Sequence, residues 1–242
     1  MHVGRQKLDA YTVYLMYRGV GALCFAMIYT LMAVYRVNVL HMNPLQLVLV
    51  GTVLEASAFL FEVPTGVVAD TYSRRLSIII GTALLGVGLV VQGSIPLISV
   101  MLGVEVILGL GYTFTSGATQ AWIAGEVGEE RVGRVFLRGA QVSRLGELIG
   151  IPLTVGLASI HLSLPIVLGG GLVLALAGFL VLFMPESGFR PTPREERTTW
   201  QAMARTLTDG TRGGRRQPVL VTFLGIAALG GMASEGFDRL SE

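Results

Sequence analysis

Residues 164–184 read LPIVLGGGLVLALAGFLVLFM, an apolar run without a single ionisable side chain. An α-helix needs about 20 predominantly apolar residues to span the hydrocarbon core of a bilayer. The strands of a membrane β-barrel are only about 10 residues long and alternate in polarity, which this run does not. The stretch therefore predicts a helix that crosses a membrane.

Five other stretches are apolar over a similar length. With the first they give six predicted spans: Ala10–Tyr35, Pro44–Ala69, Leu76–Ser94, Leu97–Ala121, Val135–Ile160 and Leu164–Met184. A seventh span is expected to begin near Pro218. The amino-terminal run exceeds the about 7–15 apolar residues of a signal peptide, and no small-residue cleavage site closes it. We therefore expect it to be the first membrane helix.

The composition agrees with a chain whose solvent is largely lipid. Hydrophobic residues make up 52% and charged residues 14% of the chain, whereas a soluble domain carries about 25% charge. The low polarity excludes intrinsic disorder, and the lone Cys24 excludes a disulfide framework. The net charge is +2 and no separate basic domain exists, so nucleic acid is not an expected partner.

The basic residues between the spans predict the orientation of the chain. One set of connections holds thirteen basic residues: Arg5, Lys7, Arg74, Arg75, Arg131, Arg134, Arg190, Arg194, Arg197, Arg205, Arg212, Arg215 and Arg216. The opposite set holds only Arg36, besides two histidines. Basic residues in short loops mark the cytoplasmic side of a membrane protein. We expect a multi-pass protein of the plasma or inner membrane with a cytoplasmic amino terminus.

These features predict three parts of the chain. Residues 1–185 form an amino-terminal half of six membrane helices, residues 186–217 a polar cytoplasmic linker, and residues 218–242 the truncated start of a second half. Within the linker, Trp200–Leu207 is compatible with an amphipathic helix on the inner leaflet and equally with a solvated connection. The expected fold class is an all-α integral membrane protein.

Charged residues are unevenly distributed among the predicted spans. They occur in the first, second, fourth and fifth spans, as Arg18, Glu55, Glu62, Glu105, Arg138, Arg144 and Glu147. A charge at membrane depth is costly, so such residues usually face a cavity or a partner. The third and sixth spans have none and are expected to face lipid only. The order charged, charged, apolar occurs twice, which predicts two three-helix inverted repeats, as in many secondary transporters.

Several of these residues are candidates for proton coupling and for lining a cavity. Counting along the spans places Glu55, Glu105, Arg144 and Glu147 in the middle third of the membrane and Glu62 and Arg138 nearer the cytoplasm. A carboxyl group in low dielectric favours its neutral form, as a proton-carrying group requires, and no basic residue lies close in sequence to Glu105 or Glu55. We expect Glu105, then Glu55, to couple protons. The expected cavity residues are Glu105, Glu55, Arg144, Glu147, Arg18, Tyr17, Tyr112 and Gln141.

The fifth span holds two further patterns. Arg144 and Glu147 are three residues apart and can form an ion pair, either as a structural strut or as part of the site. Gly139, Gly146 and Gly150 form a stripe of small residues that lets two helices approach closely, and Pro152 permits a bend. Packing is the preferred interpretation of the stripe, with a hinge as the alternative.

The connection between the second and third spans reads GVVADTYSRR over residues 66–75. It resembles the loop motif of the major facilitator superfamily at Gly66, Asp70, Arg74 and Arg75, with Thr71 and Ser73 where the motif has a basic residue and a glycine. In that family the motif latches the two halves of the transporter together at the cytoplasmic side. The resemblance implies such a gate here, with Glu62 and Arg138 beside it.

Other stretches resemble bacterial drug-efflux members of the same family. They are the run from Phe61 to Gly66, the segment from Ser116 to Gly128, the antiporter-like run from Gly146 to Pro152, and residues Glu235–Leu240. At the start of the fourth-span motif, Glu105 stands where an arginine is usual. The resemblance implies a twelve-helix protein of which this chain is the amino-terminal half plus the start of the seventh helix, with the carboxy-terminal half as its missing partner.

The function expected from these observations is proton-coupled efflux of small amphipathic compounds by alternating access. Proton-coupled uptake of a polar metabolite and a non-transporting membrane assembly subunit stay open as alternatives. An enzyme is not expected, because His2, His41, His161 and Cys24 have no catalytic or metal-binding spacing. No phosphate-binding glycine loop followed by Lys and Ser or Thr occurs, so neither a nucleotide nor a metal cofactor is expected.

Overall fold

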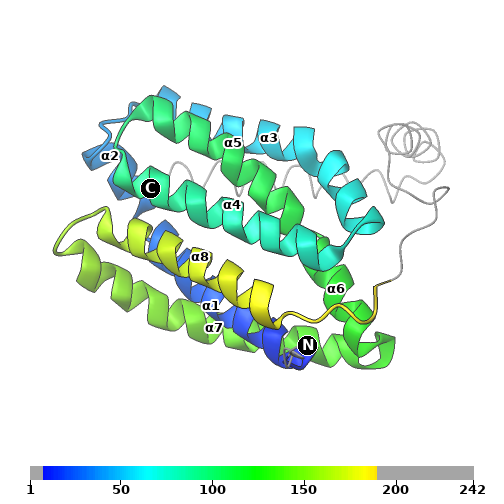
Figure 1. The fold of residues 1–242 in the computed structure, drawn as a ribbon. Helices are drawn as coiled ribbons and strands as arrows, with labels where there is room; N and C mark the ends of the chain where they lie inside the picture. Colours follow the sequence, from blue (N-terminus) through cyan, green and yellow to red (C-terminus); the bar gives the residue numbers. More distant parts are fainter. Residues whose placement is uncertain (1–7, 190–242) are drawn as a thin grey trace, which may run out of the picture. The chain divides into compact units, whose positions relative to one another are not determined.

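The computed structural model describes residues 8–189, which are helical and contain no strand. Figure 1 shows the arrangement of the eight helices of this part of the chain. Their bounds are α1 Ala10–Tyr29, α2 Met32–Asn38, α3 Pro44–Thr71, α4 Arg74–Ser94, α5 Ile98–Thr115, α6 Ala118–Val127, α7 Glu129–Ala158 and α8 Leu164–Phe183. Arg5, Lys7, the linker beyond residue 189, Trp200–Leu207, the seventh span and Glu235–Leu240 lie outside the described residues.

Two predicted spans are each divided into two helices. Between α1 and α2, the Thr30 hydroxyl donates to the Ala26 carbonyl at 2.6 Å, and Leu31 leaves helical geometry with φ −122° and ψ 17°. Such a threonine bond four residues back bends helices. Between α5 and α6, Gly117 has φ +63°, a conformation that glycine adopts without strain. The first and fourth predicted spans are each one membrane-length segment, Ala10–Asn38 and Ile98–Val127, interrupted by a bend.

Within residues 8–189, five segments are long and apolar enough to cross a membrane: Ala10–Asn38, Pro44–Thr71, Arg74–Ser94, Ile98–Val127 and Leu164–Phe183. The fifth predicted span, which is α7, is not in this set. It is long enough at 30 residues, but Arg138, Arg144 and Glu147 lower its hydropathy. Membrane crossing by α7 thus depends on neighbours that cover its charged side chains.

The helices run back and forth between two ends of the bundle, named here the α2 end and the α6 end (Figure 1). Local capping fixes where two of them begin. Asn43 and Gln46 cap the start of α3 with reciprocal side-chain to backbone hydrogen bonds of 2.9 Å, and Ser73 accepts from the Leu76 N–H at the start of α4. Each cap satisfies backbone groups that a helix start leaves free.

Packing within the bundle corrects one expectation. The main contacts pair α1 with α7, α4 with α8 and α5, and α3 with α5. The third predicted span, α4, is the most buried of the five, with 56% of its apolar window inside this part of the chain, while α3 has only 22%. Its glycines explain this: Gly81 packs on the α5 backbone at Gly111, and Gly86 packs on Leu174 of α8. An uncharged span was expected to face lipid only, but close glycine packing places it centrally here.

Candidate functional site

A cavity of about 470 Å³ opens beside α1 in the half of the bundle nearer the α6 end. Helix α1 contributes Tyr14, Tyr17 and Arg18 to its wall, and α5 contributes Tyr112. The break between α5 and α6 supplies the remaining polar wall, because Thr115, Ser116, Gly117, Thr119 and Gln120 all line the cavity. The bend that sequence reasoning missed is thus what shapes this site.

A second cavity, of about 250 Å³, adjoins the first. Its wall is largely apolar and includes Phe25 of α1, Leu85 of α4 and Leu176 of α8. Tyr17 and Arg18 line both cavities. The two cavities therefore form a polar and an apolar compartment that meet at one arginine.

Arg18 carries an unpaired charge in the described part of the chain. The two ion pairs found there join Arg36 to Glu105 and Arg144 to Glu147, so no carboxylate neutralises Arg18. The position of its backbone is fixed, because the Ser143 hydroxyl of α7 donates to the Arg18 carbonyl at 3.3 Å. A fixed backbone with a free guanidinium is an arrangement that can bind an anion.

Glu105, the leading candidate for proton coupling, lies in a different place from that expected. It is 1% exposed and pairs with Arg36 at 3.1 Å, about 10 Å from the start of α5. Gln92 Nε2 also donates to the same carboxylate oxygen at 3.5 Å, and the Tyr35 hydroxyl donates to the Gln92 carbonyl at 2.9 Å. No basic residue lies close to Glu105 in sequence, but α2 carries Arg36 to it across the bundle.

Sequence reasoning missed this pair because the partners are 69 residues apart and Arg36 was counted as a loop residue. One signal was available, since Arg36 was the only Lys or Arg in its set of loops. Glu105 lines neither of the two cavities described above. It forms a separate buried polar cluster at the α2 end.

The other charged candidates lie on exposed surfaces of the bundle. Glu55 and Glu62 are exposed on α3 and line neither of these cavities. Arg144 and Glu147 form the expected ion pair at 2.7 Å, with exposed fractions of 80% and 38%, and Glu147 lines the second cavity. Arg138 donates to Gln141 at 3.2 Å.

The glycine stripe of α7 lies against α1. A β-carbon on Gly139 would meet the Tyr14 ring, one on Gly146 the backbone of Gly19, and one on Gly150 the Leu23 carbonyl. Because these three glycines have no β-carbon, α1 and α7 can approach closely along the cavities. Pro152 is exposed, and α7 continues through it to Ala158.

The residues of the loop motif lie at the α6 end. Gly66 and Asp70 are half-buried near the end of α3. Arg74 donates to the Ala121 carbonyl at 2.9 Å and lies over the Phe189 ring, while Arg75 donates to the Val181 carbonyl at 2.7 Å. Arg74 thereby binds near the start of α6, and Arg75 binds near the end of α8.

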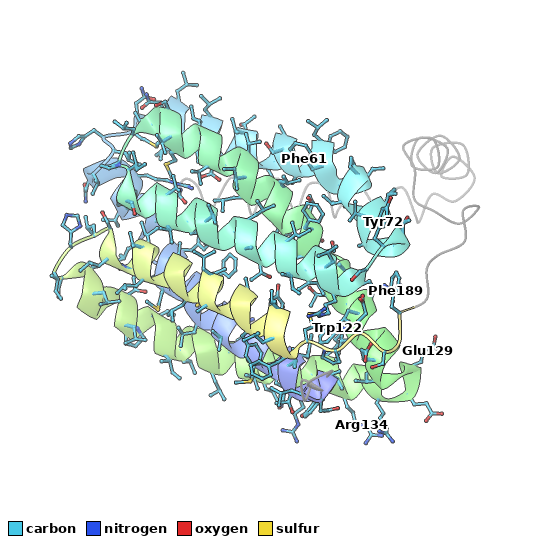
Figure 2. All side chains as sticks on the ribbon, viewed as in Figure 1. Phe61, Tyr72, Trp122, Glu129, Arg134 and Phe189 are labelled. Carbon is cyan, nitrogen blue, oxygen red and sulfur yellow. The ribbon has the colours of Figure 1, made fainter. Side chains whose placement is uncertain are left out.

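Two carboxylates that sequence reasoning missed accept hydrogen bonds at the α6 end. Glu186 accepts from the Ser73 hydroxyl at 2.7 Å and from the Arg75 N–H at 2.9 Å. Glu126 accepts from the backbone of Ser187 at 2.6 Å, and the Trp122 indole donates to the carbonyl just before Glu186, at 2.8 Å. Figure 2 shows Trp122 and Phe189 at this end. The segment after α8 is thus bound to the start of α4 and to α6.

No group of three or more His, Cys, Asp or Glu side chains suited to a metal ion occurs within residues 8–189.

Comparison with known proteins gives two findings. The family described as Major Facilitator Superfamily matches residues 16–237. A Bacillus subtilis (strain 168) protein named "Uncharacterized MFS-type transporter YxaM" is 27% identical over 157 residues, which cover 64% of this chain. The matched region spans only 37% of that relative's length.

Proposed function

Because the chain belongs to the major facilitator superfamily, we propose that it forms the amino-terminal half of a secondary transporter for small amphipathic compounds. The observation that carries this proposal is the pair of adjoining cavities, one polar and one apolar, between membrane-length helices. Ligand sites are concave, with a mainly apolar wall and a few placed polar groups. The bacterial drug-efflux members that the sequence resembles make export the first expectation for direction.

A carboxy-terminal half is the proposed partner. The matched relative is much longer than this region, and α3 exposes a large part of its surface, including Leu45 and Leu60. Such a surface needs lipid or protein to cover it. Alternating access would rock the second half against this one, with the substrate between them near the middle of the membrane.

The α6 end is proposed to face the cytoplasm. It carries Arg74 and Arg75 and, at the start of α7, Arg131 and Arg134. Short basic connections mark the inner side of a cell membrane. In this orientation the first cavity lies toward the cytoplasm, from which an exporter takes its substrate.

Glu105 is the proposed coupling carboxylate, and Glu55 is the second candidate. Glu105 is almost fully buried and holds one strong partner, Arg36. Proton binding would neutralise Glu105 and release Arg36, which loosens the contact of α2 with α5. A change in protonation would thereby become a change in helix packing.

The test uses the full-length protein in inverted membrane vesicles with an acidic interior. Three naphthalene probes that do not redistribute with pH cover the possible charges: naphthalene-2-sulfonate, 2-naphthamide and a (2-naphthylmethyl)trimethylammonium salt. We expect at least one probe to accumulate several-fold over protein-free vesicles, and a protonophore to abolish the accumulation, measured by naphthalene fluorescence.

The direction of movement decides between the proposals. Loss of preloaded probe from the acidic interior would contradict export and favour proton-coupled uptake. An absence of any movement that depends on the pH gradient, for all three probes, would favour a non-transporting assembly subunit.

A further inference from the structure

We propose that the substrate is an amphipathic organic anion whose charged group binds Arg18 in the first cavity and whose apolar body occupies the second. This inference rests on the proposed transport function and names the class of substrate. The inference rests on the position of the unpaired Arg18 guanidinium beside the apolar second cavity.

The charge of the first cavity is the first argument. Among the described residues that line it, Arg18 alone is charged at neutral pH. No carboxylate of the described chain lies within ion-pair distance of it. A permanent cation in this cavity would be repelled, whereas an anion would gain a charge-assisted contact.

The charged residues of the second cavity do not cancel the positive charge of the first. Glu147 lines it, but the carboxylate of Glu147 is bound by Arg144 at 2.7 Å. Counting Arg18 and Arg144 against Glu147 leaves a net charge of +1 for these three residues, and of the two arginines only Arg18 lines the cavities. An anionic group on the substrate would neutralise that charge.

The polar wall of the first cavity suits an anion because its side chains include hydrogen-bond donors. Tyr14, Tyr17, Tyr112 and Gln120 line the first cavity, and their side chains carry hydroxyl and amide groups that can donate hydrogen bonds. Helix α6 starts at the same wall behind Gly117, without a side-chain cap. The positive end of its dipole adds to the field of Arg18 there.

The apolar compartment accounts for the rest of the ligand. Phe25, Leu85, Val173 and Leu176 line the second cavity, which has about 250 Å³ of space. Because Tyr17 and Arg18 belong to both walls, one molecule can place its anionic group at Arg18 and its hydrocarbon part beyond it. The guanidinium is planar and binds carboxylate, sulfonate or phosphate oxygens in pairs, so these are the expected charged groups.

The experiment measures binding of the same three naphthalene probes to the purified full-length protein in nanodiscs. We expect the sulfonate to bind at least about tenfold more tightly than the trimethylammonium probe. Arg18→Gln should weaken sulfonate binding about tenfold or more, the loss that about 1.4 kcal/mol of a charge-assisted contact produces. Arg18→Lys should retain part of the affinity, because the charge stays while the paired geometry is lost.

Arg134→Gln is the matched control. It removes the same charge from an exposed residue of α7 outside both cavities, near the edge of the bundle in Figure 2. We expect it to bind the sulfonate as the wild type does. Equal thermal unfolding midpoints for the wild type and Arg18→Gln would show that lost binding does not reflect lost folding.

Three results would overturn the inference: tighter binding of the cation or the amide, no binding of the sulfonate, or unchanged sulfonate affinity in Arg18→Gln. Movement of the cation in the vesicle assay would likewise overturn the substrate class while leaving transport supported. Sulfonate binding that depends on Arg18, without movement of any probe driven by the pH gradient, would support the anion site and contradict the proposed transport.

Discussion

Replacing Arg36 with methionine is expected to lower the thermal unfolding midpoint of the full-length protein by roughly 10 °C. The guanidinium is the ion-pair partner of a carboxylate that is 1% exposed. Removing one partner of a buried pair costs about 3–5 kcal/mol, because the remaining charge is buried without compensation. The Arg36→Met variant should therefore show the largest loss of stability among single changes in this bundle, measured by scanning fluorimetry in nanodiscs.

Two further variants make this result specific. The double change Arg36→Met with Glu105→Met removes both charges and should recover most of the lost midpoint, since apolar replacements of buried pairs are often neutral. Arg144→Met removes the exposed pair, whose members are 80% and 38% exposed, and should change the midpoint by no more than about 3 °C, for about 0–1 kcal/mol. Equal losses for Arg36→Met and Arg144→Met would contradict the assignment of a buried pair.

Substituting Gly146 by alanine is the second large effect that we expect. A β-carbon at this position would press on the Gly19 carbonyl oxygen and lie 3.0 Å from the Leu23 backbone nitrogen. Backbone atoms cannot rotate away as a side chain can, so α1 and α7 must separate. Overpacking of this kind costs about 1–3 kcal/mol, which corresponds to a midpoint lowered by roughly 6 °C.

The same helix supplies the control, because a β-carbon on Gly156 of α7 would meet no atom within 4 Å. Gly156→Ala should leave the midpoint unchanged or raise it slightly, since alanine favours a helix over glycine by about 1 kcal/mol. If Gly146→Ala were as stable as Gly156→Ala, the close contact between α1 and α7 would be wrong.

The positions of the membrane helices could be predicted from the sequence because length and hydropathy alone determine them. The start of α3 at Pro44 agrees with the predicted span, and the end of α4 at Ser94 does as well. The breaks at Leu31 and Gly117 could not be predicted in this way. They depend on one threonine hydrogen bond and one left-handed glycine, which leave the average hydropathy of the span unchanged.

The lateral arrangement and the site were less predictable. A span without charges can contact either lipid or other helices. In α4, the glycines allow close packing on α5 and α8, which places the helix inside the bundle. Glu105 and Arg36 meet only because α2 turns back toward α5, a consequence of tertiary packing. Arg18 was identified as a charge that needs a cavity, whereas the polar wall around it arises from the break before α6.

Coupling of transport to protons through Glu105 is the central claim, and proteoliposomes with the full-length protein test it most directly. The Glu105→Gln variant keeps a hydrogen-bonding side chain beside Arg36 but cannot exchange a proton. With the probe that the wild type moves, we expect this variant to retain exchange of labelled for unlabelled probe at equal pH and to lose the acceleration by a pH gradient. Acceleration equal to that of the wild type in Glu105→Gln would contradict this claim, and the same result in Glu55→Gln would exclude the second candidate as well.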